Sequence, residues 1–317
     1  MKVPGNWFAG GLLLLLLSAT SCDHPSIRRP SDDGLQSALR GRYLANAVSL
    51  CVFCHSEIDW SREGFPPKGE RFAGGSPPFP EGRPARSAPN LTPDAETGAG
   101  PWTDTALARA VRQGIGHDGR PLSPLLPCAS FREMADEDVE SIILYLRSMP
   151  GVRGRTPTSS LSAPPFWRSP GPVETPASSP GVEVGSYLLR IAACGYCHTP
   201  LGADGKPVPG MDLAGGNTFK GPWGEVVAPN ITPDPTGLDL LSERDFERAV
   251  RNGDRHGSRL SAVMPWGYYR DMTESDVHSI YAALKSRLGV RHEVDASELP
   301  TPCRKCGRTH GGGSRNG

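Results

Sequence analysis

Apolar residues recur at helical spacing in two stretches of the chain that lie 138 residues apart. In each stretch they follow the pattern i, i+3, i+4, i+7, which places them on one face of a helix. They are Val139, Ile142, Ile143 and Leu146 in the first stretch, and Val277, Ile280, Tyr281 and Leu284 in the second. The pattern therefore predicts two matching amphipathic helices.

Shorter helices are predicted ahead of these two, again in matching pairs. The spacing favours helices over residues 35–50 and 184–193, and middle helices over residues 105–113 and 243–252. A glycine suited to a helix C-cap follows each middle helix, at Gly114 and Gly253. The predicted fold class is therefore all-α, with long loops between the helices.

The matching helices belong to an internal repeat that spans most of the chain. The shared motifs are Gly-x-Tyr-Leu at 41–44 and 185–188, Cys-x-x-Cys-His at 51–55 and 194–198, Ala-Gly-Gly at 73–75 and 214–216, and Ala-Pro-Asn-(Leu/Ile)-Thr-Pro-Asp at 88–94 and 228–234. The separation falls from 143 residues at the cysteine motifs to 138 at the last helix, so loop deletions account for the drift. A period this long indicates a duplicated domain of about 110 residues rather than a solenoid.

Composition suggests where these domains begin and end. We predict two tandem domains, over residues 35–150 and 181–292. Residues 151–180 are rich in proline, serine and threonine and are predicted to form a semi-extended linker. Residues 293–317 form a polar tail that is predicted to be disordered, and residues 1–21 precede the first domain as a signal peptide.

The overall composition limits how such small domains are stabilised. Only 37% of the residues are hydrophobic and 7% are aromatic, whereas Gly (38) and Pro (33) are abundant. Small cores of this kind need something else to fill them, and the eight cysteines are candidates for anchoring it. Lys+Arg and Asp+Glu both number 34, and this balance argues against a nucleic-acid partner.

The first 21 residues have the features of a secretory signal peptide. Lys2 precedes an apolar stretch with six consecutive leucines, and small residues follow it. This stretch is too short to span a membrane, so we expect no transmembrane helix in the mature chain. Small residues running into Cys22 resemble a bacterial lipobox, which would make Cys22 a lipid anchor; ordinary cleavage near Ser21 is the alternative. Either outcome predicts a periplasmic protein or a membrane-anchored lipoprotein facing the periplasm.

Each repeat carries one Cys-x-x-Cys-His motif, formed by Cys51, Cys54 and His55 or by Cys194, Cys197 and His198. This motif is the attachment signature of c-type haem, because two thiols three residues apart meet the two vinyl groups. The adjacent histidine then lies under the iron as its proximal ligand. A zinc site would need the two cysteine pairs to come together, and a redox dithiol would need a βαβ setting. We therefore expect two covalently bound haem c groups.

With these motifs and the repeat, the chain resembles the diheme cytochromes c of the class I fold, and in particular the cytochrome subunits of bacterial membrane dehydrogenases for alcohols and gluconate. The resemblance covers residues 35–150 and 181–290. It implies that the carbonyl groups of Pro89 and Pro229 bond the proximal histidines. It also implies that Met264, followed by Pro265, is the sixth iron ligand of the second haem, with His198 opposite.

The first haem departs from this pattern, because Leu126 stands where the second repeat has Met264. Leucine cannot bind iron. The alternatives are an open or water-bound position, or ligation by Cys128, by His117 or by Met134, which aligns with Met272. In the tail, Cys303 and Cys306 lack a following histidine, so a local disulfide is expected there rather than a third haem.

The resemblance implies an electron-transfer protein without enzymatic activity of its own. We expect it to carry single electrons between a dehydrogenase and a downstream acceptor, both of them redox protein partners. The alternative is a haem enzyme, with peroxide or sulfur-compound chemistry at an open or cysteine-ligated first haem. A sensor that binds small ligands at the same haem is a third class.

Overall fold

The computed structural model describes residue 1 and residues 32–75, 88–123, 125–154, 168, 170–176, 179–221, 224–255, 257–261, 263–296, 301–302, 304, 307 and 309–310. Residues 2–21 of the predicted signal peptide lie outside the described residues, as do Cys22, Cys303 and Cys306. Residues 35–150 are called the N-terminal repeat and residues 181–292 the C-terminal repeat.

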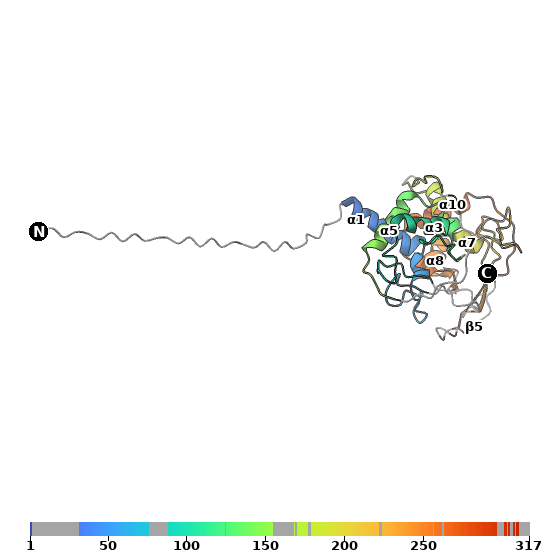
Figure 1. The fold of residues 1–317 in the computed structure, drawn as a ribbon. Coiled ribbons are helices and arrows are strands. Elements are labelled where there is room, and N and C mark those ends of the chain that lie inside the picture. Colours follow the sequence, from blue (N-terminus) through green and yellow to red (C-terminus); the bar gives the residue numbers. More distant parts are fainter. Residues whose placement is uncertain are drawn as a thin grey trace.

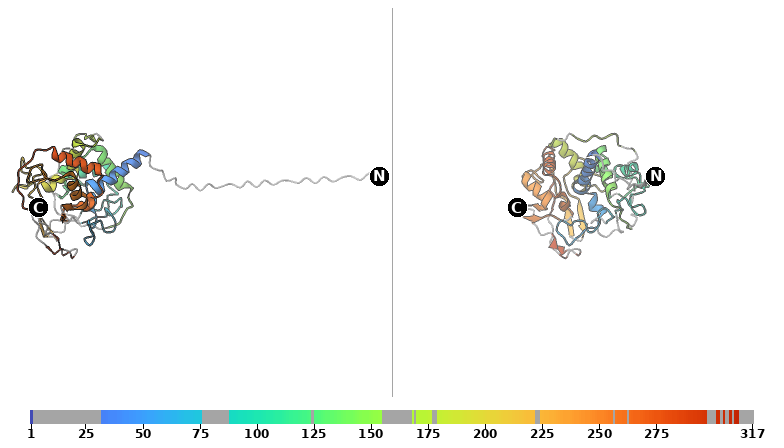
Figure 2. Two further views of the ribbon diagram at one scale, coloured as in Figure 1. Left: turned by 180° about the vertical axis from the view of Figure 1, so that it is seen from behind. Right: turned by 90° about the vertical axis from the view of Figure 1, so that its left-hand side faces the viewer.

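Both repeats contain the same order of helices. The N-terminal repeat has α1 (Asp32–Tyr43), a π-helical turn (Leu44–Val48), α2 (Cys51–His55), α3 (Asp104–Gln113), α4 (Cys128–Phe131) and α5 (Asp136–Ser148). The C-terminal repeat has α6 (Val182–Ile191), α7 (Cys194–His198), α8 (Glu243–Asn252), α9 (Trp266–Tyr269) and α10 (Glu274–Lys285). In Figure 2 the elements of the N-terminal repeat, blue to green, lie beside those of the C-terminal repeat, yellow to red.

Side-chain N-caps and the two predicted C-cap glycines bound the helices in the structure. The hydroxyl oxygens of Ser242 and Thr273 accept hydrogen bonds from backbone N–H groups three residues on, at the starts of α8 and α10. Gly114 and Gly253 have left-handed conformations with φ of 67° and 63° and form the C-caps of α3 and α8. The helix predicted over residues 35–50 differs, because it changes into the π-helical turn after Tyr43.

In each repeat the first helix packs tightly against the last: α6 against α10, and α1 against α5. Figure 1 labels α1 and α5 of the second pair. The close approach depends on a glycine in the shared Gly-x-Tyr-Leu motif. A Cβ atom at Gly41 would lie 1.8 Å from the carbonyl oxygen of Ser141, and one at Gly185 would lie 1.7 Å from that of Ser279. Any side chain at these glycines would therefore force the helices apart.

The expected all-α class is too narrow, because the described residues also include short antiparallel strand pairs. They are β1 (Thr218–Gly221) with β2 (Gly224–Val227), β3 (Asp254–Arg255) with β4 (Ser258–Arg259), and β5 (Thr301–Pro302) with β6 (Thr309–His310). The β1–β2 pair contains Phe219, Val226 and Val227, residue types that favour extended backbone. The fold is helix-rich with small strand pairs in its loops.

The linker and the tail are both attached to the folded part where they are described. The N–H of Asp136, the first residue of α5, donates to the carbonyl of Val173 in the linker at 2.9 Å. The tail predicted to be disordered contains β5 and β6, and Ala296 ahead of them is buried. Thr301 of β5 lies against Gly224, where a Cβ atom would be 2.5 Å from its hydroxyl oxygen. The tail thus contacts the β1–β2 pair and contains regular structure, which its polar, glycine-rich composition did not predict.

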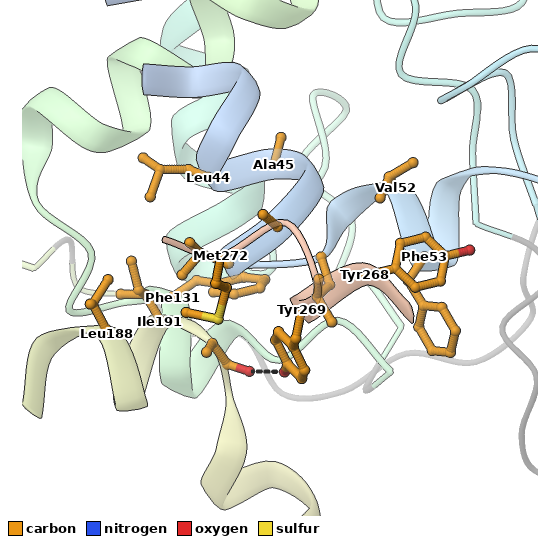
Figure 3. Close-up of a cluster of buried hydrophobic side chains, with 14 of the residues drawn as sticks. Leu44, Ala45, Val52, Phe53, Phe131, Leu188, Ile191, Tyr268, Tyr269 and Met272 are labelled. Atoms are coloured by element: carbon orange, nitrogen blue, oxygen red, sulfur yellow. Dashed lines mark hydrogen bonds between the residues drawn. The ribbon is translucent and has the colours of Figure 1, made fainter. Parts of the chain in front are cut away.

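A hydrophobic core runs from one repeat into the other (Figure 3). Tyr268 of α9 packs edge-on against Phe53 of α2, with ring centroids 5.1 Å apart. The Tyr268 hydroxyl donates to the carbonyl of Phe65 at 2.8 Å, also in the N-terminal repeat. Its neighbour Tyr269 donates to the carbonyl of Ala192, in its own repeat, at 3.0 Å. The two repeats therefore share one core.

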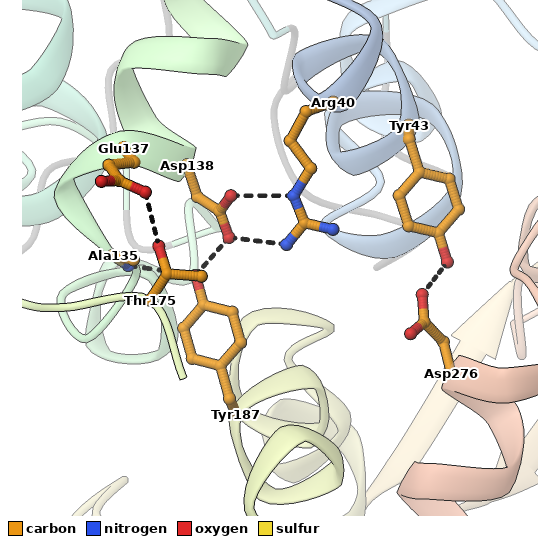
Figure 4. Close-up of polar contacts among 8 residues, drawn as sticks. All are labelled: Arg40, Tyr43, Ala135, Glu137, Asp138, Thr175, Tyr187 and Asp276. Carbon is orange, nitrogen blue, oxygen red and sulfur yellow. Dashed lines mark hydrogen bonds and ion pairs between the residues drawn. The ribbon is translucent and has the colours of Figure 1, made fainter. Parts of the chain in front are cut away.

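Polar contacts between the repeats are reciprocal (Figure 4). The tyrosine of each Gly-x-Tyr-Leu motif donates to an aspartate near the start of the other repeat's last helix: Tyr187 to Asp138 at 2.6 Å, and Tyr43 to Asp276. Each tyrosine oxygen also accepts a backbone N–H at the start of that helix, from Ala135 or Thr273. Such an exchange of equivalent contacts is the pattern of a two-fold interface between identical subunits.

The two tyrosine–aspartate pairs differ in their surroundings. Asp138 is buried and also accepts two hydrogen bonds from the Arg40 guanidinium, both at 2.9 Å. Asp276 is only half-buried. None of the described helices is both long enough and apolar enough to cross a membrane.

Candidate functional site

Each Cys-x-x-Cys-His motif forms a one-turn helix that begins after a residue in a left-handed conformation. That residue is Leu50 before α2, with φ of 51°, and Ala193 before α7, with φ of 54°. Residues other than glycine rarely adopt this conformation, and strained positions of this kind cluster at functional sites. Phe72 and Leu213, which precede the Ala-Gly-Gly motifs, repeat the same feature. Both copies therefore keep the same backbone strain next to the cysteine motifs.

The two motif histidines are held by the proline carbonyls that the resemblance implied. His55 Nδ1 lies 2.7 Å from the carbonyl oxygen of Pro89, and His198 Nδ1 lies 2.8 Å from that of Pro229. A carbonyl can only accept, so Nδ1 must carry the proton and the lone pair is on Nε2. Burial lowers the pKa of His55, which also favours the neutral ring. The Nδ1 contact thus fixes the orientation of each ring.

The proline carbonyls are themselves fixed by a buried asparagine and threonine. The side-chain oxygen of Asn230 accepts from the backbone N–H and the hydroxyl of Thr232, at 2.9 and 2.8 Å. The amide of Asn230 donates to the carbonyl of Val290 at 2.8 Å. Asn90 and Thr92 make the same contacts in the N-terminal repeat, with Val152 as the acceptor. This network explains the shared Pro-Asn-x-Thr sequence. The asparagine next to each proline bonds a backbone carbonyl that follows the last helix, and so fixes the segment whose proline carbonyl accepts from the histidine.

The four motif cysteines are free thiols in the structure. Burial raises the pKa of Cys51 to about 11, and that of Cys54, Cys194 and Cys197 to about 12. Two thiols three residues apart on one helical turn, followed by an imidazole whose Nδ1 is bonded to a proline carbonyl, are the donors that a c-type haem needs. The residues present therefore fit the group in both repeats.

The two motifs lie near each other. Cys54 contributes to the raised pKa of Cys197, although burial is the main cause. Burial raises the pKa of Tyr268 and of Tyr269, with smaller contributions from Cys54 to Tyr268 and from Cys194 and Cys197 to Tyr269. Tyr268 packs on Phe53 of one motif, and Tyr269 bonds the carbonyl of Ala192 just ahead of the other, so adjacent residues of α9 lie beside both attachment sites.

The described residues of the loops that precede α4 and α9 make matching backbone hydrogen bonds. The amides of Leu126 and Met264 donate to the carbonyls of Ser123 and Ser261, each at 3.1 Å. Further along, the amides of Cys128 and Trp266 donate to the carbonyls two residues before them, at 2.7 and 2.8 Å. Leu122 and Leu260 donate to the C-cap glycines of α3 and α8, each at 2.8 Å. Leu126 therefore occupies the position that Met264 has in the other repeat, and both side chains are partly buried against the core.

Cys128 occupies the position that Trp266 has in the C-terminal repeat. Its thiol is buried against the C-terminal end of α3, with Sγ 3.8 Å from the carbonyl oxygen of Ala110. A Cβ atom at Gly114 would lie 3.1 Å from that sulfur, just as one at Gly253 would contact the ring of Trp266. Burial raises the pKa of Cys128 to about 11. Cys128 is thus a packing residue of the α3–α4 contact.

The two other candidates for the first haem also have separate roles. Met134 is 1% exposed, and its amide donates to the carbonyl of Phe131 at 3.0 Å. Met272 is 2% exposed and bonds Tyr269 in the same way, so this methionine is a core residue in both repeats. His117 is exposed and lies beside the Trp102 ring, with centroids 4.4 Å apart.

The cross-repeat contacts of Tyr43, Tyr187, Asp138 and Asp276 were not predicted from the sequence. The signal for the tyrosines was present, because Gly-x-Tyr-Leu is one of the shared motifs. A motif gives no direction for a side chain, so a contact with the other repeat could not be inferred from it. The roles of Asn90 and Asn230 were hidden for the same reason.

Comparison with known proteins gives the family context of this geometry. The chain is 31% identical over 276 residues to the cytochrome c subunit of the quinone alcohol dehydrogenase of Gluconacetobacter polyoxogenes, covering 78% of this chain and 55% of the relative. It is 31% identical over 302 residues to the gluconate 2-dehydrogenase cytochrome c subunit of Pantoea cypripedii, covering 84% and 63%. A diheme c-type cytochrome of Cereibacter sphaeroides is 28% identical over 202 residues, covering 58% and 63%.

The chain thus spans a little over half the length of the alcohol dehydrogenase relative. It matches no protein-family model.

Proposed function

Because the chain is homologous to the cytochrome c subunits of bacterial quinone alcohol, gluconate and fructose dehydrogenases, we propose that it is a diheme c-type cytochrome that carries single electrons. The observation that supports this most directly is the repeated geometry of Cys-x-x-Cys-His with a proline carbonyl on the histidine Nδ1. Each haem, when bound, supplies an iron that alternates between the ferrous and ferric states.

In this proposal the protein residues hold and orient the two groups. Cys51 and Cys54 would attach one haem, and His55 would bind its iron through Nε2. Cys194, Cys197 and His198 would hold the other in the same way. The hydrogen bonds from Nδ1 to Pro89 and Pro229 raise the basicity of the histidines and fix their ring planes. No proton transfer or bound substrate is required.

Met264 is the proposed sixth ligand of the second iron. It lies on the loop before α9, partly buried against the core, and its backbone position is fixed by the bond to Ser261. A thioether is a soft, neutral ligand, so histidine–methionine ligation raises the reduction potential of a haem. The second haem is therefore expected to be the higher-potential centre.

We further propose two class I cytochrome domains at residues 35–150 and 181–292, with a dehydrogenase as donor and a separate redox protein as acceptor. Location in the periplasm follows from the predicted signal peptide, and a lipid anchor at Cys22 is part of the same proposal. Mass spectrometry of the mature N-terminus tests the anchor, since an unmodified or missing Cys22 would contradict it.

Haem content and redox titration test the proposed function. The protein, expressed with the c-type haem maturation machinery, should contain two covalently bound haems and show two reversible one-electron steps. Cys54→Ala and Cys197→Ala should each remove one haem, whereas the matched control Cys128→Ser should retain both. A protein without covalent haem, or one that loses haem in the control, would overturn the assignment.

A further inference from the structure

The loop before α4 corresponds to the loop that carries Met264, but it has no iron-binding side chain at the equivalent position. The described residues of the loops before α4 and α9 make three matching backbone hydrogen bonds, one of them to the C-cap glycine of α3 or α8. Leu126 thus occupies the backbone position from which Met264 is proposed to reach iron. Leucine has no donor atom, so the loop positions an apolar side chain where a sixth ligand would be.

The other donors in this region are held elsewhere. The Cys128 thiol fills the position of Trp266 under the α3 C-cap, and its sulfur is directed at the carbonyl of Ala110. Met134 is buried at the same core position as Met272. Met272 is a core residue in a repeat where Met264 is the proposed ligand, so Met134 is assigned to the core as well. His117 is exposed beside Trp102. Within the N-terminal repeat, the residues that the structure does not describe, 76–87 and Pro124, contain no His, Met, Cys or Lys.

We propose that the iron of the haem attached at Cys51 and Cys54 has no sixth ligand from the protein, because Leu126 cannot bind it and Cys128, His117 and Met134 do not. Its distal face then binds small neutral diatomic molecules such as CO and NO. This inference rests on the proposed diheme function. The second haem, closed by Met264, does not bind them.

The surroundings of the open position favour neutral ligands. The described residues of this loop are Leu122, Ser123, Leu125 and Leu126, and all four are half-buried. An apolar distal side gives no strong hydrogen-bond donor to a bound anion, whereas CO and NO need none. Leucine in place of methionine therefore leaves the position to an external ligand and favours a neutral one over an anion.

Carbon monoxide binding to the dithionite-reduced holoprotein tests this directly. Total haem is measured by the pyridine haemochrome assay and bound CO by the difference spectrum of the same sample. We expect one CO for every two haems. The ferric protein should give one high-spin and one low-spin signal in low-temperature EPR.

Reciprocal variants provide the matched controls. Leu126→Met should lose CO binding and convert the high-spin signal to low-spin, and Met264→Leu should raise binding to two CO per protein. Leucine and methionine have similar volumes, so both variants are expected to fold. Cys128→Ser should leave the ratio of one CO to two haems unchanged.

The ways in which the test can fail are distinguishable. A protein with fewer than two haems would contradict the proposed function, whatever its CO binding. Two haems that are both low-spin and do not bind CO would overturn the open-site inference alone. If the first haem is low-spin in the parent and becomes high-spin in Cys128→Ser, the sixth ligand of its iron is the Cys128 thiol and the open-site inference is wrong.

Discussion

The buried hydroxyl of Tyr187 joins the two repeats, and its removal should lower the free energy of unfolding more than removal of the equivalent hydroxyl of Tyr43. Tyr187→Phe keeps the ring and deletes only the oxygen, which donates to Asp138 at 2.6 Å and accepts from the N–H of Ala135 at 3.0 Å. Tyr187, Asp138 and Ala135 are 3%, 2% and 0% exposed, so water cannot replace either bond.

The magnitude follows from the two bonds that are lost. A hydrogen bond to a charged group contributes about 1.5–3 kcal/mol, and a buried N–H left without a partner costs about 1–3 kcal/mol. Asp138 keeps its two bonds from Arg40, and neighbouring effects are not additive. We therefore expect Tyr187→Phe to lower the free energy of unfolding by about 2–4 kcal/mol.

The equivalent variant in the other repeat is a matched control. Tyr43→Phe deletes the same kind of hydroxyl, but Tyr43 and Asp276 are only half-buried and Thr273 is exposed. Water can satisfy the groups left behind, so the expected loss is about 0.5–1.5 kcal/mol.

Urea-induced unfolding of the holoprotein, followed by far-UV circular dichroism, measures both variants against the parent. An equal loss in the two variants, or a larger loss in Tyr43→Phe, would refute the reasoning from burial.

Three further predictions concern the repeat itself. Gly185→Ala should lower stability by about 1–3 kcal/mol or more, because its Cβ atom would overlap the carbonyl of Ser279; thermal unfolding should show no such loss for Gly171→Ala, where the space is open. Bonds from Thr236 lower the pKa of Asp234, so its contribution is present above about pH 4 and lost as the pH falls through the folded-state pKa. Asp234→Asn should therefore make the loss of stability in acid shallower in urea titrations between about pH 2 and 5, and an unchanged slope would contradict this. Asn230→Ala should shift the reduction potential of the C-terminal haem and leave that of the N-terminal haem in place, which a redox titration can resolve; equal shifts in both would exclude a local role.

Features that depend on neighbours along the chain were predictable from the sequence. Caps at Ser242, Thr273, Gly114 and Gly253 involve residues within one helical turn, so their residue types reveal them. The proline–histidine hydrogen bonds were implied by resemblance, since a motif shared with a family carries its local geometry. The strand pair β1–β2 was missed, because a few extended residues in a loop have no periodicity to detect.

The sequence by itself determined the duplication, the two Cys-x-x-Cys-His motifs and the substitution of Leu126 for Met264, because each is a matter of residue identity at fixed spacing. Only the tertiary structure decided that Tyr43 and Tyr187 bond to the opposite repeat, and that Tyr268 packs on Phe53. It also decided that Cys128 lies under the α3 C-cap in the position of Trp266. These are contacts between residues that are distant in the chain, and their partners are selected by packing and by the burial of hydrogen-bonding groups, which no local pattern records.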